Sequence, residues 1–334
     1  MSASPSALFL TVAGAGAGLG HVKRCAALGS ALAALGARVG FVVAGDAERL
    51  TSMGMSLPGL EALPWTRSPE LALEALLAAR ADVAVVDAYD ATDELLRSLR
   101  RSGACIAAID DLGERELPVD VIINRARYGY AEIPGRRLLL GPQFALLDAG
   151  FADVPGRAIR PVPSRVLVTL GGEDAGDALA EAVAAVERAL PEASVDLVVG
   201  PFAHSRSVGG ARVKVHRGLP SLRALLLEVD VAVTAAGMTL YECLASGTPA
   251  VAVPLAENQK PAYDELSRAG LIVPGVPDLK AAVEGLARDA ALRRELSERG
   301  RAAVDGRGAA RVAIELIRAA VPAAPGRGAA RESR

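Results

Sequence analysis

The chain has 334 residues, of which 51% are hydrophobic but only 3% aromatic, and its formal net charge at pH 7 is −2. This length suffices for two ordinary domains, whose cores must be built from Ala, Val and Leu. The small net charge gives no electrostatic reason to bind nucleic acid or an anionic membrane, and no apolar run reaches the roughly 18 residues of a membrane-spanning helix.

Short apolar runs alternate with helical patterns along most of the chain. The first series of predicted strands is Leu8–Ala13, Arg38–Val43, Val83–Val86, Cys105–Ile109, Val121–Ile123 and Leu138–Leu140. The second series is Val166–Thr169, Val195–Val199, Val213–His216, Val229–Thr234, Ala250–Val253 and Leu271–Val273. Segments between them, such as Leu71–Ala81 and Ala178–Ala189, carry apolar residues at helical spacing. This alternation predicts an α/β fold with doubly wound parallel sheets.

A proline-rich stretch without periodicity, Phe151–Pro163, separates the two series of strands. Proline removes backbone donors and favours extended chain, so this stretch is predicted to link two domains. We therefore expect a Rossmann-like domain over residues 1–150, a linker over 151–163, a second Rossmann-like domain over 164–321 and a frayed tail over 322–334. With two such domains facing a cleft, ligands should bind beyond the carboxyl ends of the strands.

The loop after the first predicted strand is rich in glycine and ends in a histidine. Gly14, Gly16, Gly18 and Gly20 precede His21, which opens a helical pattern. Glycine lets a ligand approach the backbone, and a helix N-terminus favours an anion, so Gly18 and Gly20 are candidate ligand contacts. His21 is a candidate general base, because the positive end of a helix disfavours the charged imidazolium. The plainer alternative is a tight turn with a histidine that caps the helix.

A dinucleotide site is a weaker interpretation of the same loop. The dinucleotide fingerprint needs a third glycine five positions after the first, where this chain has Leu19 or His21. Asp46, after the second strand, could still hold a ribose, so this alternative stays open.

Polar residues follow three further predicted strands. Asp87, Tyr89 and Asp90 come after Val83–Val86, where Asp90 could instead cap the next helix. Gly171 and Gly172 follow Val166–Thr169 and offer bare amides to phosphate oxygens. The third segment begins at Thr234 and reaches a Glu257-Asn258-Gln259 loop.

The turn in this third segment has the features of a nucleotide site. Amides at Gly237, Met238 and Thr239 can receive a pyrophosphate at the start of a helix. Glu242 has two oxygens that can accept both hydroxyls of a ribose. The alternative for Glu242 is an ordinary surface carboxylate.

Several sequence blocks occur in the order found in a known family. They are GLGHVKRC, VVDAYD, IDDL, GPQFALL, LGGED, TAAGMTLYECLASGTPAVAVPLAENQ and VDGRGAARV, spanning roughly residues 8 to 318. In these blocks the chain resembles the UDP-sugar hydrolases of pseudaminic acid biosynthesis and related spore-coat polysaccharide proteins. That resemblance implies a two-domain GT-B-type fold, akin to the glycosyltransferase that makes lipid II.

The resemblance also implies an activity and roles for residues. The activity is hydrolysis of a UDP-linked deoxy-acetamido sugar at its anomeric carbon, with no metal and no cofactor. His21 matches the histidine that activates water, Tyr89 a tyrosine that faces the sugar, and Asn258 with Gln259 the polar loop that contacts it. Gly237, Met238 and Glu242 match the nucleotide site. Arg24, Asp87, Glu257 and the glycines already named complete the expected substrate contacts.

The chain departs from this family at one place. Members usually carry an Arg-x-Asp-x-Ser stretch where this chain has Leu10 to Gly16, LTVAGAG. His21 therefore lacks a local carboxylate partner, and Asp87 or Asp110 could take that place. A glycosyltransferase on the same scaffold and an inactive nucleotide-sugar-binding protein stay open as alternatives. In each case Lys23 or Arg24 could help the helix amides to hold the diphosphate.

The remaining expectations concern the cysteines, the localisation and the partners of the protein. Cys25, Cys105 and Cys243 are widely separated, so we expect neither a disulfide nor a metal site. Cys25 and Cys243 lie on apolar helical stretches and are expected to be buried. The first residues lack the basic segment of a signal peptide, which predicts a cytoplasmic protein. The expected partner is a nucleotide sugar, and a monomer is the default although the sequence does not give the oligomeric state.

Overall fold

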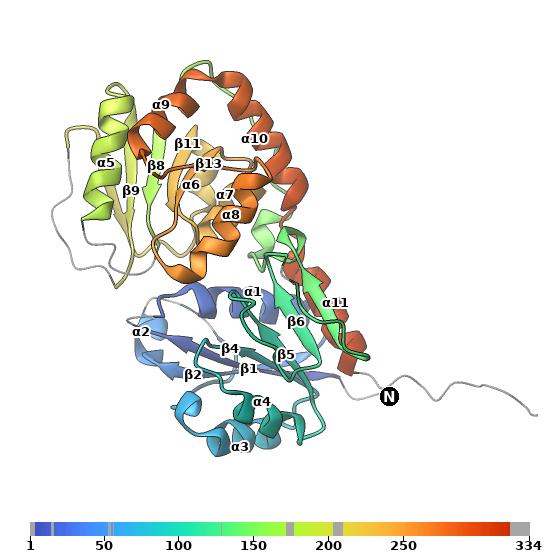
Figure 1. Ribbon diagram of the computed structural model, residues 1–334. Coiled ribbons are helices and arrows are strands. Elements are labelled where there is room, and N and C mark those ends of the chain that lie inside the picture. Colours follow the sequence, from blue (N-terminus) through green and yellow to red (C-terminus); the bar gives the residue numbers. More distant parts are fainter. Residues whose placement is uncertain are drawn as a thin grey trace, which may run out of the picture.

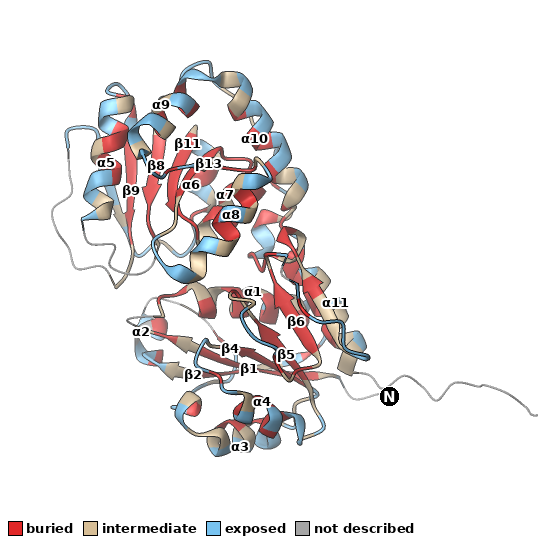
Figure 2. Ribbon diagram, in the orientation of Figure 1, coloured by how far each residue is buried: buried red, intermediate tan, exposed pale blue. Residues whose placement is uncertain are grey.

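The computed structural model describes residues 4–14, 17–52, 55, 57–127, 129–171, 177–202 and 210–320. They form two lobes, each built on a parallel sheet with helices on both faces (Figure 1). The strands of both sheets are largely buried, whereas the outer faces of the helices are exposed (Figure 2). The predicted fold class, two Rossmann-like doubly wound domains, is confirmed.

The first lobe has a seven-stranded sheet in the order β3-β2-β1-β4-β5-β6-β7. Its strands are β1 Ser6–Ala13, β2 Arg38–Gly45, β3 Leu60–Ala62, β4 Val83–Asp87, β5 Cys105–Ile109, β6 Val121–Asn124 and β7 Arg137–Leu140. Its helices are α1 Gly20–Ala34, α2 Ala47–Ser52, α3 Pro69–Ala79 and α4 Asp93–Arg100, with short 3-10 turns at Trp65–Arg67, Pro142–Phe144 and Ala149–Phe151.

The second lobe repeats this arrangement with six strands in the order β10-β9-β8-β11-β12-β13. The strands are β8 Arg165–Thr169, β9 Ser194–Val199, β10 Val213–Arg217, β11 Val231–Ala235, β12 Ala250–Val253 and β13 Val273–Pro274. The helices are α5 Ala178–Ala189, α6 Arg223–Glu228, α7 Met238–Ser246, α8 Lys260–Arg268, α9 Leu279–Arg288 and α10 Ala290–Ala303. A 3-10 turn, η4, covers Glu257–Gln259.

Alternation along β1 explains why each sheet has a core on both faces. Phe9 packs with residues of α1 on one face, whereas Leu8 and Leu10 pack with α3 and α4 on the other. Successive side chains of a strand point to opposite faces, so a strand buried on both sides is apolar throughout. This is why the apolar runs predicted most strands, Cys105–Ile109 and Ala250–Val253 with the observed bounds.

Three local predictions need correction. The short edge strand β3 has two exposed residues of three, and the sequence pattern missed it. The strand expected at Leu271–Val273 lies instead at Val273–Pro274. The cap of α4 is Thr92, whose side chain accepts a hydrogen bond from the Leu95 amide, and not Asp90.

The last described helix, α11 (Gly308–Ala320), returns to the first lobe and packs beside α1. Its Val312 and Leu316 belong to the core of the first sheet. The return passes so close to other backbone that a Cβ on Gly308 would lie 2.2 Å from the Ala145 carbonyl oxygen. The sequence alone did not indicate which sheet this helix covers.

Arginines fasten much of the proline-rich stretch to the second lobe. Arg293, on α10, donates to the carbonyls of Arg160 and Pro161 at 2.8 Å. Arg301, on the same helix, donates to those of Val154 and Pro155. Residues 154–161 are therefore bound to the second lobe at several points.

Candidate functional site

The candidate site lies where the carboxyl ends of both sheets face each other. In each sheet the strand order reverses between two neighbours, β1 and β4 in the first lobe and β8 and β11 in the second. Such reversal points are where doubly wound sheets bind ligands. The loops after β1 and β4 carry His21 and Tyr89, and the loop after β11 leads into α7.

His21 is held by a carboxylate from the neighbouring strand. It is the second residue of α1 and is buried, and its Nδ1 lies 2.6 Å from Oδ1 of Asp87 at the end of β4. Because β1 and β4 are paired in parallel, their ends meet and bring the two residues together. An ionised carboxylate only accepts hydrogen bonds, so Nδ1 carries a proton, and in the neutral ring Nε2 is then the nitrogen with the lone pair. The sequence left the partner of His21 open between Asp87 and Asp110, and it is Asp87.

Arg24 keeps Asp87 ionised. Burial alone would raise the pKa of Asp87, but the charges of Arg24 and His21 outweigh it and hold this pKa well below its usual value. Arg24 donates from Nε and Nη2 to the two oxygens of Asp87, at 2.7 and 2.6 Å. Its Nη1 donates to Asp111 at 2.6 Å. Arg24 was expected to contact substrate, yet its side chain is only 3% exposed and is occupied by carboxylates.

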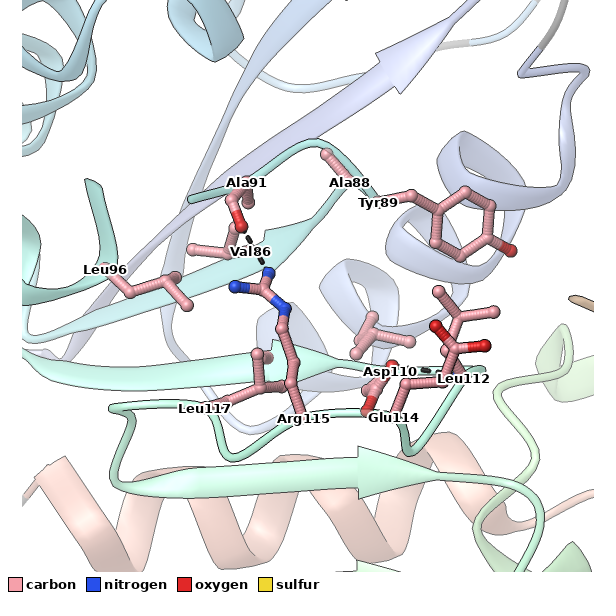
Figure 3. Close-up of a pocket in the computed structure, with 12 residues that line it drawn as sticks. Val86, Ala88, Tyr89, Ala91, Leu96, Asp110, Leu112, Glu114, Arg115 and Leu117 are labelled. Atoms are coloured by element: carbon pink, nitrogen blue, oxygen red, sulfur yellow. Dashed lines mark hydrogen bonds between the residues drawn. The ribbon is translucent and has the colours of Figure 1, made fainter. Parts of the chain in front are cut away.

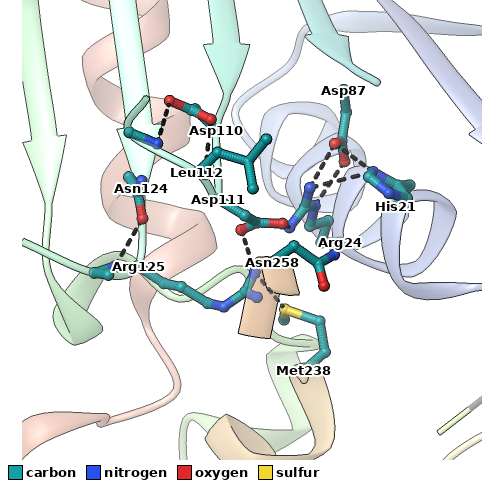
Figure 4. Close-up of polar contacts among 12 residues, drawn as sticks. His21, Arg24, Asp87, Asp110, Asp111, Leu112, Asn124, Arg125, Met238 and Asn258 are labelled. Atoms are coloured by element: carbon teal, nitrogen blue, oxygen red, sulfur yellow. Dashed lines mark hydrogen bonds and ion pairs between the residues drawn. The ribbon is translucent and has the colours of Figure 1, made fainter. Parts of the chain in front are cut away.

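Tyr89 connects this cluster to the second lobe. Its ring stands edge-on to the ring of His21, with 4.7 Å between the centroids. Its hydroxyl donates to Asp111 Oδ2 at 2.7 Å and accepts from Asn258 Nδ2 at 2.8 Å. The structure thus brings three residues singled out by the sequence, His21, Tyr89 and Asn258, into one group. His21 and Asn258 are labelled in Figure 4.

Sequence reasoning missed two members of this group, Asp111 and Arg125. Asp111 accepts from Arg125 Nη1 at 2.5 Å, and Arg125 also lies 3.7 Å from the Met238 sulfur and over the ring of Tyr241. Both residues come just after strands, β5 and β6, where a search for polar residues would have found them. Only Asp87 and Asp110 were considered from the sequence as carboxylate partners of His21.

On the second lobe, the start of α7 presents free amides to the cleft. Gly237 is the residue before the helix, and no side chain in the described part of the chain caps it. The first amides of a helix have no partner within the helix, so those of Met238 and Thr239 are available to an anion. A Cβ on Gly237 would meet nothing within 4 Å, so the amides rather than the lack of a side chain are what this turn offers.

Glu242 lies one turn further along α7 and is half-buried. Burial raises its pKa to about 7, with a contribution from Asp148 that is opposed by Lys23 on α1. Within the described part of the chain its carboxylate accepts no hydrogen bond. It is therefore a half-buried acceptor that a ligand hydroxyl could satisfy.

The other residues expected from the sequence to contact the substrate are glycines that follow β1 and β8, and two side chains of η4. Gly18 has φ +64° and its amide donates to Gly14, and Gly20 is the first residue of α1. Gly171 has φ +103° after β8, whereas Gly172 lies outside the described residues. Glu257 forms an ion pair with Lys260 at 2.6 Å, and Gln259 accepts from the Leu255 amide at 3.0 Å. Both side chains are thus engaged in their own turn.

A cavity of about 60 Å³ adjoins Tyr89 in the first lobe (Figure 3). Apolar side chains of β4, β5 and α4 line it together with Asp110, Glu114 and Arg115, and Figure 3 shows Arg115 extending toward Ala91. Arg115 is fixed by the Ala91 carbonyl and by Asp93. A second space of about 10 Å³ lies between the lobes, bounded by Arg24, Asp111, Arg125 and Met238 among others.

The described ranges hold neither a candidate metal site nor a membrane-spanning helix. No group of three or more His, Cys, Asp and Glu side chains there could hold a metal ion. None of the helices in these ranges has the length and apolar character needed to cross a membrane. Cys25 and Cys243 are buried, as predicted.

Comparisons with known proteins identify the fold. No protein-family model matches the chain, and no curated protein matches its sequence. Among solved structures, the calicheamicin glycosyltransferase CalG4 superposes with a TM-score of 0.65 at 20% identity, covering 96% of this chain and 100% of CalG4. MurG of Acinetobacter baumannii gives 0.65 at 13% identity, covering 94% and 100%. The Streptomyces glycosyltransferase SsfS6, solved with thymidine diphosphate, gives 0.62 at 17% identity, covering 93% and 99%. The chain therefore has the GT-B fold of these glycosyltransferases, as its sequence blocks implied.

Proposed function

We propose that this protein is a nucleotide-sugar-dependent glycosyltransferase. The observation that carries the proposal is the His21–Asp87 pair, which faces the free amides of α7 across the junction of the two lobes. The His21–Asp87 pair can activate a hydroxyl, and the amides at the start of α7 can hold a diphosphate. Likeness of fold to glycosyltransferases, one of them solved with a nucleoside diphosphate, supports this pairing of roles.

The proposed reaction is attack of an acceptor hydroxyl on the anomeric carbon of the donor. Nε2 of His21 removes the hydroxyl proton, and Asp87 stabilises the imidazolium that forms. The new bond joins the acceptor oxygen to C1, while the bond from C1 to phosphate oxygen breaks and its electron pair leaves on the diphosphate. Such general-base assistance is typically worth about 10²–10⁴ in rate.

Groups of the second lobe would hold the leaving group. The amides of Met238 and Thr239 can bind diphosphate oxygens, and Glu242 can accept the hydroxyls of the ribose. Of the two cations considered from sequence, Arg24 is already bound by Asp87 and Asp111, so Lys23 is the one that remains for the diphosphate. The base would be uracil if the resemblance to UDP-sugar enzymes holds.

Hydrolysis of the nucleotide sugar is the second candidate, with water in place of the acceptor. The ordered sequence blocks that resemble UDP-sugar hydrolases favour it. In this case the substrate would be a UDP-linked acetamido-deoxy sugar of surface-polysaccharide or nonulosonic acid synthesis. The cavity beside Tyr89, which could receive part of an acceptor, favours transfer instead.

The test measures nucleotide release from UDP- and dTDP-sugars with and without a panel of hydroxylated acceptors. Release that requires an acceptor supports transfer, release of free sugar without one supports hydrolysis, and binding without release indicates an inactive nucleotide-sugar-binding protein. His21→Ala should lower turnover by at least about 10² while nucleotide affinity stays.

The chain supplies a matched control for this variant. His216, on β10 of the second lobe, also pairs with an aspartate, Asp196, at 2.7 Å. His216→Ala removes an equivalent pair outside the cleft, so its turnover should match the unaltered protein. Equal losses in both variants would contradict the assignment of His21 as the base.

A further inference from the structure

We infer that Asp111 is a positioning residue that couples docking of the two lobes to the alignment of His21. This inference rests on the proposed function for its catalytic meaning, but its structural part can be tested without turnover. Asp111 touches neither His21 nor the second lobe through any hydrogen bond described above. Its influence would pass through Arg24, Tyr89 and Arg125, whose side chains donate hydrogen bonds to it.

The first connection runs from Asp111 to the base. Arg24 Nη1 donates to Asp111, while the Nε and Nη2 of the same guanidinium donate to Asp87. A guanidinium is planar and rigid, so fixing one end of it fixes the other. Asp111 therefore sets the place of Asp87, which in turn sets the ring of His21.

The second connection runs from Asp111 to the other lobe. Tyr89 donates its hydroxyl proton to Asp111 and receives a hydrogen bond from Asn258 of η4. Arg125 donates to Asp111 and contacts Met238 and Tyr241, both on α7. The same carboxylate thus accepts hydrogen bonds from Arg24, Tyr89 and Arg125, of which Arg24 and Arg125 are labelled in Figure 4.

Charge balance strengthens the argument. Two carboxylates, Asp87 and Asp111, are enclosed with two guanidiniums, Arg24 and Arg125, and their side chains are 0–9% exposed. The group is neutral before His21 gains a proton. Without the charge of Asp111 it would carry an excess positive charge in a place that water screens poorly, which opposes protonation of His21 during the reaction.

The experiment compares Asp111→Asn with Asp120→Asn. Asp120 lies in the same lobe and also accepts from an arginine, Arg100 at 2.8 Å, and from a backbone amide, Ile106 at 2.9 Å, but it precedes β6 at the opposite end of the sheet. Both substitutions keep the size of the side chain and remove one charge. Asp111 is buried and Asp120 is partly exposed, so the free energy of unfolding of each variant is measured by denaturant titration and compared with the readouts below.

Two readouts are used, one of them independent of activity. The chain has three histidines, so the ring signals of His21 can be assigned by NMR with His21→Ala as reference. In the unaltered protein the His21 Nδ1 proton should be shifted strongly downfield by its bond to Asp87, and addition of UDP should change that shift. Asp111→Asn should weaken the downfield signal and abolish its response to UDP, whereas Asp120→Asn should keep both.

The second readout is turnover under the conditions of the acceptor panel. Asp111→Asn should lower kcat about 10–100-fold with UDP affinity changed less than about threefold, because the diphosphate binds on the second lobe. If no variant turns over any nucleotide sugar but the His21 signal responds as expected, the proposed function fails and this inference stands. If Asp111→Asn keeps both its kcat and the His21 signal, the inference is overturned.

Discussion

Asp87 Oδ1 and His21 Nδ1 lie 2.6 Å apart although 66 positions separate the two residues. The contact exists because β1 and β4 are neighbours in the sheet while the chain between their ends forms β2, β3 and α3. A strand order that reverses at this point places the end of one strand beside the start of the helix after the other. The relationship is thus a consequence of topology, and it fixes Nδ1 as the nitrogen of His21 that faces Asp87.

Asp87→Asn should impair catalysis more than binding. An amide in this place can present either its oxygen or its NH₂ group to Nδ1, so the tautomer is no longer fixed, and the imidazolium loses its countercharge. We expect kcat to fall by about 10² or more with little change in nucleotide affinity. The variant also leaves Arg24 with one carboxylate fewer in a buried place, so the free energy of unfolding should fall by about 3 kcal/mol. Steady-state kinetics and denaturant titration test the two effects, and an unchanged kcat would rule out the role of Asp87.

The first sheet and its histidine show how much the sequence could predict. Strands such as Cys105–Ile109 can be predicted from their apolar sequence, because a strand covered on both faces must be apolar throughout. The edge strand β3 is largely exposed and need not be apolar, so its sequence did not indicate a strand. His21 stood out because it follows a run of glycines, a local feature.

The partners of His21 and Arg24 could not be predicted in the same way. They depend on which strands become neighbours, a long-range property. Arg24 illustrates the difference: a basic residue three positions after His21 suggests a diphosphate contact, yet the fold places two carboxylates around it. A local pattern indicates that a basic residue lies on a helix. Which carboxylates pair with that residue depends on which strands are neighbours in the sheet.

Tyr89→Phe separates the packing of the ring from the role of the hydroxyl. The ring keeps its edge-on contact with His21, while the bonds to Asp111 and Asn258 are lost. Because Tyr89 is at the lobe junction and partly exposed, we expect less than about 1 kcal/mol of lost stability. Turnover should fall about tenfold, since Asn258 no longer fixes the second lobe against the first.

Asn258→Ala provides the complementary change from the other lobe. If the hydroxyl acts through this bond, combining the two substitutions should cost hardly more than either alone. Fully additive losses, measured as kcat/KM in a double-mutant cycle, would show that the two residues act separately.

Gly308→Ala tests the return of α11 to the first lobe. A Cβ at this position would lie 2.2 Å from the Ala145 carbonyl oxygen and 2.8 Å from its nitrogen, and backbone atoms cannot move aside as a flexible side chain can. Overpacking of this kind costs about 1–3 kcal/mol. Gly285→Ala, within α9, is the control, because its Cβ would meet nothing within 4 Å and alanine favours a helix by up to about 1 kcal/mol. Thermal unfolding should shift down for the first variant and up for the second, and a stabilised Gly308→Ala would contradict the packing described.

Glu242→Gln should make the protein more stable and a poorer binder. Burial raises the pKa of Glu242 to about 7 in the folded protein, so the folded state holds a proton that the unfolded state has released between about pH 4.5 and 7. The protonated carboxyl therefore adds stability at low pH, and this contribution is lost as the pH rises through about 7. Glutamine is neutral at every pH, so the variant should have the higher Tm at pH 8 and nearly the same Tm at pH 5.

If the carboxylate of Glu242 accepts ribose hydroxyls, the affinity of the unaltered protein for UDP should rise as the pH rises through about 7. The affinity of the variant should be roughly tenfold weaker and should not show that rise. Calorimetric titrations at pH 5.5 and 8 decide this, and a variant that binds UDP as tightly as the unaltered protein at pH 8 would remove Glu242 from the nucleotide site.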